Sequence, residues 1–109
     1  MNGDITRFEI VGRRLYLRGM RRQPERIAGI LQQRYRAAAH SGDWSTCLKV
    51  AGELATIGLR DAAAADVVYA EGYAHEQLGE IDRARACYGT VLMMQRGHEK
   101  ARRRLAGLR

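Results

Sequence analysis

The chain has 109 residues, enough for one domain with a modest core, and 46% of them are hydrophobic. This composition excludes a disordered protein, and no apolar run is long enough to cross a membrane. The formal net charge of +7 comes from 17 arginines and two lysines against 12 carboxylates, which favours acidic or phosphate-bearing partners.

The first stretch of the chain, residues 5–18, predicts a β-hairpin. Gly12 opens a two-residue loop that suits a type II′ turn, and the resulting register separates apolar from polar side chains. The alternative is one amphipathic helix over residues 14–22, which Gly19 would weaken. An isolated two-stranded ribbon is marginal in water, so this one is expected to pack on the helices or on a second chain. The apolar face that would make this contact, a candidate assembly surface, consists of Phe8, Ile10, Leu15 and Leu17.

A mainly helical domain is expected after the basic connector that ends at residue 22. Pro24 suits the first turn of a helix, where its missing N–H costs nothing. Asp43 and Asp61 are placed to cap the helices that follow them, because a carboxylate accepts from free backbone N–H groups. The five helices expected from apolar spacing cover residues 24–40, 44–57, 62–78, 81–95 and 99–108. The expected core consists of Trp44, Cys47, Leu54, Val68, Gly72, Leu78, Ile81, Ala84, Tyr88 and Val91.

The third and fourth of these helices carry the most informative pattern. Gly72 and Ala84 are small enough to let two antiparallel helices approach closely, and Tyr88 fills the space beside them. Gly79 suits the left-handed turn that ends a helix. This pattern resembles the tetratricopeptide repeat (TPR), a family of stacked helical hairpins that mostly bind other proteins. The resemblance implies a mainly α fold of TPR-like antiparallel hairpins that form a short right-handed α-solenoid. The β-hairpin expected from the alternation in residues 5–18 would precede it.

A weaker copy of the pattern lies upstream. Gly42 stands where Gly79 stands and Cys47 where Ala84 stands, whereas Tyr35 replaces Gly72 and departs from the family. The two turn glycines are 37 residues apart, against a family period of about 34. The excess fits residues 61–64 as one extra helical turn. The alternative fold is an ordinary four-helix bundle with short loops.

The resemblance also sets the expected division of the chain. The hairpin and connector occupy residues 1–22, and a TPR-like helical domain occupies residues 23–109. Its repeats fall at about residues 28–61 and 65–98, and a basic helix at about 99–108 caps the array against solvent.

Signals of catalysis are weak, and no enzyme, cofactor or metal site is expected. The three histidines, His40, His75 and His98, have no partner histidine four residues away, and Cys47 and Cys87 form no Cys-x-x-Cys pair. His75 and Glu71 share a helix face, which is interpreted as a surface contact. The two cysteines are expected to be buried free thiols.

The resemblance implies a partner-binding groove, because the first helix of each TPR lines a concave surface. A protein-interaction adaptor or a chaperone-like assembly factor that binds another protein or peptide is therefore expected. Aromatic, arginine and amide side chains suit peptide recognition, although a solvated helix face is the alternative. The residues that carry over to this groove are Gln32, Arg36, His40, Tyr69, Tyr73, Glu76 and Gln77.

The arginine-rich ends support a second hypothesis, binding of nucleic acid or a ribonucleoprotein. Residues 1–36 carry a net charge of +6, residues 37–95 carry −4 and residues 96–109 carry +5. This complementarity also favours a homodimer or a larger closed assembly, with a monomer as the alternative. No signal peptide is evident, so a cytoplasmic location is expected. The candidate anion-binding arginines are Arg13, Arg14, Arg21, Arg22, Arg102, Arg103 and Arg104.

Overall fold

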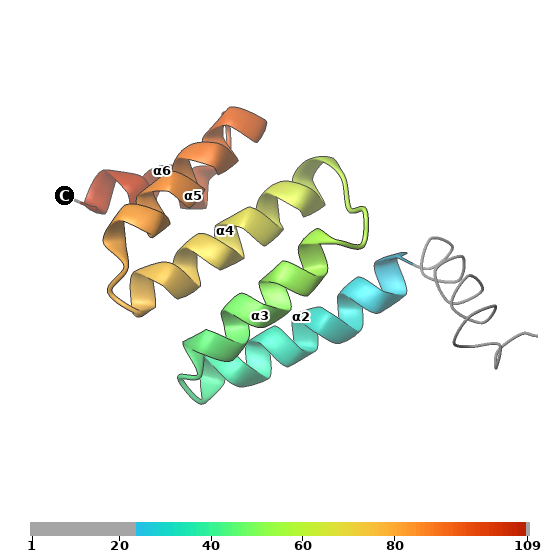
Figure 1. Ribbon diagram of the computed structural model, residues 1–109. Helices are drawn as coiled ribbons and strands as arrows, with labels where there is room; N and C mark the ends of the chain where they lie inside the picture. Colours follow the sequence, from blue (N-terminus) through green and yellow to red (C-terminus); the bar gives the residue numbers. More distant parts are fainter. Residues whose placement is uncertain (1–23, 109) are drawn as a thin grey trace, which may run out of the picture.

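The computed structural model describes residues 24–108, and these residues form five α-helices without any β-strand (Figure 1). The expected β-hairpin, its apolar face and Arg13, Arg14, Arg21 and Arg22 lie outside the described residues. No helix between residues 24 and 108 is both long enough and apolar enough to span a bilayer. The helices are α2 (Pro24–His40), α3 (Trp44–Ala55), α4 (Asp61–Gln77), α5 (Ile81–Met94) and α6 (Glu99–Gly107).

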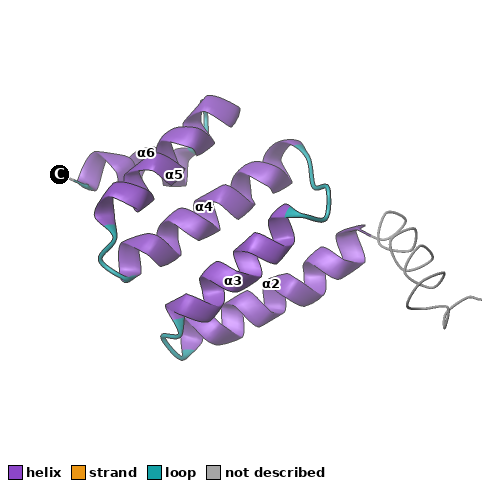
Figure 2. Cartoon of the chain, in the orientation of Figure 1, coloured by secondary structure: helices purple, strands orange, loops and turns teal. Residues whose placement is uncertain are grey.

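Each helix packs against the next one along the chain, and short loops join them (Figure 2). Figure 1 shows α2, α3 and α4 side by side, with α5 and α6 packed beyond α4. The prediction of five helices is confirmed, and the C-terminal end of α2 at His40 agrees with the sequence pattern. Residues 61–64 are helical and form the first turn of α4.

The two turn glycines behave alike. Gly42 and Gly79 have φ angles of +78° and +81°, a backbone region that side chains with a Cβ rarely adopt. The first helix of each hairpin, α2 or α4, therefore ends in the same kind of turn. The second helix, α3 or α5, begins two residues after the glycine.

The two predicted aspartate caps have different outcomes. Asp43 caps α3, because its carboxylate accepts from the backbone N–H of Thr46 at 3.2 Å and from the Thr46 hydroxyl at 2.6 Å. The cap at Asp61 was predicted wrongly. Asp61 is itself the first residue of α4, with φ of +54°, and Arg60 stands at the N-cap without a side-chain bond to the helix.

Most of the core prediction is confirmed. Cys47, Leu54, Gly72, Ala84, Tyr88 and Val91 are all buried. Trp44, Val68 and Ile81 are only partly buried. Leu78 was placed in the core wrongly: it is 40% exposed, because it is the C-cap residue of α4 and its side chain leaves the apolar stripe at the turn.

Gly72 provides the closest helix approach. A Cβ at this position would lie 2.8 Å from the Cβ of Cys87, closer than real Cβ contacts, and 3.0 Å from Cε1 of Tyr88, closer than most of them. Tyr88, which faces Gly72, and Ala84 of the same helix are both fully buried. The predicted contact between α4 and α5 through small residues is therefore present in the structure.

Candidate partner-binding face

Side chains join the first helices of the two hairpins and the last helix of the chain. The Tyr35 hydroxyl on α2 donates to the backbone carbonyl of Ala70 on α4 at 2.6 Å. Further along α4, Glu76 is paired with Arg104 of α6. Helices α2, α4 and α6 therefore contribute to one continuous face, called here the α2–α4–α6 face.

A row of rings runs across this part of the molecule. Trp44 of α3 meets Tyr73 of α4 edge-on, with ring centroids 5.5 Å apart. Tyr69 stacks on Tyr73 at 6.4 Å and lies 5.3 Å from the ring of His98, just before α6. Rings in such offset contacts favour a fixed arrangement of the helices that carry them.

Glu76 is the centre of a polar network beneath the row. Arg104 donates to both of its carboxylate oxygens, from Nε at 3.1 Å and from Nη2 at 2.8 Å. The buried Tyr88 hydroxyl donates to the same carboxylate at 2.7 Å, and burial together with this bond raises the pKa of Tyr88. The Arg104 guanidinium also lies 4.9 Å from the Tyr73 ring centroid. These contacts fasten α6 onto α4 and α5.

A first cavity, of about 200 Å³, lies between α2 and α4. Apolar groups of Tyr35, Leu54, Val67 and Ala70 form part of its wall. Its polar lining residues are Gln32, Arg36 and Asp66, with Ala63 completing the set.

A second cavity, of about 460 Å³, lies between α4 and the start of α6. Charged side chains dominate its lining, which consists of Asp66, Tyr69, His98, Glu99, Lys100 and Arg103. Asp66 lines both cavities.

The orientation of His98 is fixed by two contacts. Its Nδ1 accepts from the backbone N–H of Ala101 at 3.2 Å and so caps α6. The proton is therefore on Nε2, which donates to Asp66 at 3.0 Å. The contact between Asp66 and His98 was not predicted, because the two residues are 32 positions apart and no local pattern links them.

The seven predicted groove residues fall into three groups. Gln32 and Arg36 line the first cavity, and Tyr69 lines the second. Tyr73 and Glu76 lie on the same side of α4 but are engaged by Arg104. His40 and Gln77 are exposed at the ends of their helices and line neither cavity. The structure therefore brings three of the residues to a cavity and adds Asp66, which sequence reasoning missed.

The predicted C-terminal arginine patch is divided among different contacts. Arg104 is held by Glu76, and Arg102 donates to the backbone carbonyl of Arg96 at 2.7 Å and to Glu99 at 3.4 Å. Arg103 is exposed and borders the second cavity. Of these three arginines, Arg103 is the one placed to meet an anion from solution.

Comparisons with known proteins do not assign a family to the chain. No family model, curated protein or solved structure matches it.

Proposed function

We propose that this chain is a non-catalytic, TPR-like adaptor or assembly factor that binds a segment of another protein on the α2–α4–α6 face. The first cavity is the observation that carries the proposal, because it combines an apolar wall with Arg36, Gln32 and Asp66 at one place. We expect an apolar side chain of the partner to enter it. The polar groups would then bind the neighbouring backbone or charge of the partner.

Self-similarity between the hairpins supports the TPR-like part of the proposal. With an offset of 37 residues, Cys47 corresponds to Ala84 and Leu54 to Val91, and all four are buried. The turn glycines share one backbone conformation. Equivalent residues thus hold equivalent places, as expected for a repeat.

The size of the first cavity favours a peptide side chain over a small molecule. Small-molecule sites commonly measure about 300–1,000 Å³ and enclose most of their ligand. The first cavity, at about 200 Å³, is smaller than that range. One bulky side chain of a partner protein is a better match for a space of this size.

The nucleic-acid hypothesis is less well supported between residues 24 and 108. Phosphate binding depends on guanidinium and ammonium groups that are free to face the backbone of the ligand. Arg102 and Arg104 instead spend hydrogen bonds on groups of this chain. Protein binding is therefore the preferred proposal, and recovery of nucleic acid is an outcome that the experiment must detect.

Affinity capture with the full chain at moderate salt, with and without nuclease, tests the proposal. The cavity variant is Ala63→Leu, which fills the first cavity, and its matched control is Ala62→Leu in the same exposed first turn of α4. We expect a protein partner that survives nuclease treatment, is retained by the control and is lost with Ala63→Leu. Recovery of nucleic acid without protein, or equal capture by both variants, would contradict the proposal.

A further inference from the structure

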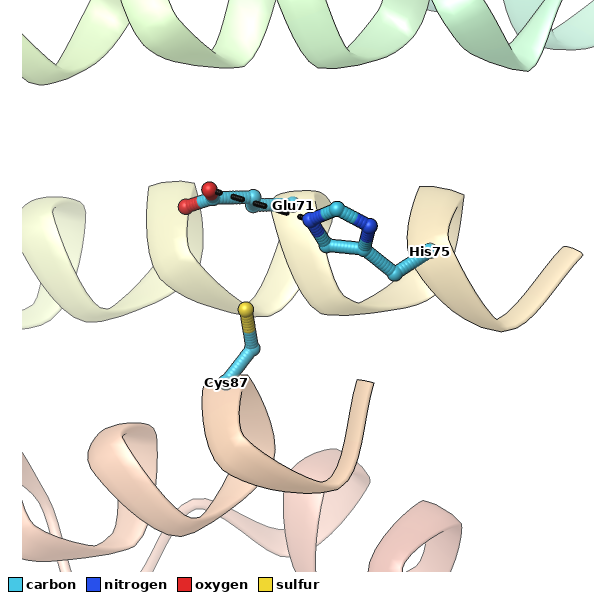
Figure 3. A group of neighbouring side chains, drawn as sticks. All are labelled: Glu71, His75 and Cys87. Carbon is cyan, nitrogen blue, oxygen red and sulfur yellow. Dashed lines mark ion pairs between the residues drawn. The ribbon is translucent and has the colours of Figure 1, made fainter. Parts of the chain in front are cut away.

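A cluster of three potential metal ligands lies between α4 and α5 (Figure 3). Glu71 and His75 are one helical turn apart on α4, and Cys87 comes from α5 with its sulfur directed toward α4. One ligand atom from each, a carboxylate oxygen, a ring nitrogen and the sulfur, all lie within 4.8 Å of one another.

His75 is the most constrained member of the cluster. The residue is 8% exposed, and its Nδ1 lies 2.6 Å from a carboxylate oxygen of Glu80. In the neutral tautomer that carries its proton on Nδ1, His75 donates to Glu80 and directs the lone pair of Nε2 toward the cluster. Nε2 lies 4.0 Å from a carboxylate oxygen of Glu71, beyond hydrogen-bonding distance.

This arrangement matches the way proteins orient a metal-binding histidine. The ring nitrogen that does not bind the metal usually donates to a carboxylate, which fixes the tautomer and raises the basicity of the other nitrogen. Glu80 occupies that place here. In the described part of the chain Nε2 has no hydrogen-bond partner, and it faces the thiol of Cys87 and the carboxylate of Glu71.

We propose that Glu71, His75 and Cys87 bind a Zn²⁺ ion, with Glu80 as the positioning residue for His75. Oxygen, imidazole nitrogen and thiolate sulfur are the donors that Zn²⁺ takes in proteins, and their mixture disfavours Mg²⁺ or Ca²⁺. Three protein ligands leave the fourth tetrahedral position to water or to a group from a partner.

Binding requires two local changes. The donor atoms must move closer together, since zinc bonds are about 2.0–2.3 Å long. Glu71 can supply much of this movement, because its side chain is 45% exposed and free to change rotamer. The Cys87 thiol must also lose its proton to solvent, since burial raises its pKa to about 11 and the charge of Glu71 adds to the effect.

The proposed zinc site is separate from the α2–α4–α6 face. At 100° per residue, Glu71 and His75 lie on roughly the opposite side of α4 from Tyr69 and Tyr73. Metal binding at this position would join α4 to α5 without occupying either cavity. The zinc proposal therefore stands or fails independently of partner binding.

Cobalt titration of the full-length reduced chain at neutral pH provides the test. Co²⁺ replaces Zn²⁺ in such sites, and a bound thiolate gives a near-ultraviolet charge-transfer absorption. The chain has two cysteines, Cys47 and Cys87, so every such signal must come from one of them. We expect one ion per chain, displacement of Co²⁺ by Zn²⁺, and a higher thermal midpoint when Zn²⁺ is present.

Four variants locate the site. Cys87→Ser should abolish the thiolate absorption, whereas Cys47→Ser, the matched control in the first hairpin, should retain it. Glu71→Gln changes a half-exposed side chain that does not hold the core, and it should weaken Co²⁺ binding. Glu80→Gln should weaken it by about 10–100-fold, the usual effect of losing a carboxylate behind a metal-bound histidine. Absence of the absorption in the parent chain, or its persistence in Cys87→Ser, would overturn the zinc proposal.

Discussion

The two hairpins place one tyrosine and one small residue at equivalent positions, but in opposite order. In the first hairpin Tyr35 is on α2 and Ala51 is on α3, whereas in the second Gly72 is on α4 and Tyr88 is on α5. Both tyrosine hydroxyls reach α4, one donating to the carbonyl of Ala70 and the other to Glu76. The comparison shows that two hairpins with matching turns can differ in which helix carries the bulky residue.

The exchange also changes how tightly each tyrosine is held. Tyr88 is completely buried, and α6 covers its hydroxyl through Arg104 and Glu76. Tyr35 is partly buried and borders the open first cavity. The second hairpin should therefore be the more sensitive to substitution, and the following predictions test that difference.

The largest effect is expected from Tyr88→Ala. Removing a large buried aromatic side chain typically costs about 3–5 kcal/mol, a large part of the stability of a small domain. Tyr35→Ala should cost less, since part of that ring already faces solvent. Urea unfolding followed by circular dichroism would rank the two variants. A greater loss from Tyr35→Ala would reverse the comparison.

The second largest effect is expected from Gly72→Leu, which should lower the free energy of unfolding by about 1–3 kcal/mol through overpacking. The Cβ of the new leucine would clash with the side chains of Cys87 and Tyr88. Gly52→Leu in α3 is the matched control, because a Cβ there meets no atom within 4 Å. If thermal unfolding showed no difference between Gly72→Leu and the parent chain, the close approach of α4 and α5 would be incorrect.

Glu76→Ala should cost about 1–3 kcal/mol, because it leaves the Tyr88 hydroxyl and Arg104 without their acceptor. Arg103→Ala is its control and should stay within about 0.5 kcal/mol of the parent chain, as exposed substitutions usually do. Chemical denaturation measures both. Equal stability of the two variants would show that the network does not stabilise the fold.

The smallest effect concerns the two aspartates. Asp43→Ala should lower the thermal midpoint through loss of the α3 cap, whereas Asp61→Ala should not lower it by the same mechanism.

The hydroxyl of Thr46 holds the pKa of Asp43 below its usual value. The contribution of Asp43 is therefore present above its unfolded pKa and is lost as pH falls through the lower folded value. Thermal melts of the parent chain, Asp43→Ala and Asp61→Ala across the acid range would reveal this; parallel curves for parent and Asp43→Ala would contradict it.

Local signals accounted for much of the fold. Apolar spacing and the glycines at positions 42 and 79 predicted the helices and their turns, since these depend on residues close in sequence. Asp61 shows the limit, because the loop before α4 puts that residue in a left-handed conformation. The same aspartate–helix signal that was correct at Asp43 was therefore misleading there.

The candidate sites were harder to predict, because they depend on residues far apart in the chain. Arg104 meets Glu76 across 28 positions, and no spacing rule connects them. The pair Glu71 and His75 was visible on one helix face, but Cys87 joins it from another helix. Short metal-binding motifs in the sequence therefore do not reveal this cluster.

The position of Trp44 gives the molecule a built-in fluorescent reporter. It is the single tryptophan of the chain, and its contact with Tyr73 joins α3 of the first hairpin to α4 of the second. Its emission should therefore follow the docking of one hairpin on the other, while far-ultraviolet dichroism follows helix content. Two coincident transitions would show that the hairpins unfold as one cooperative unit, and two separate ones would show that each hairpin has a stability of its own.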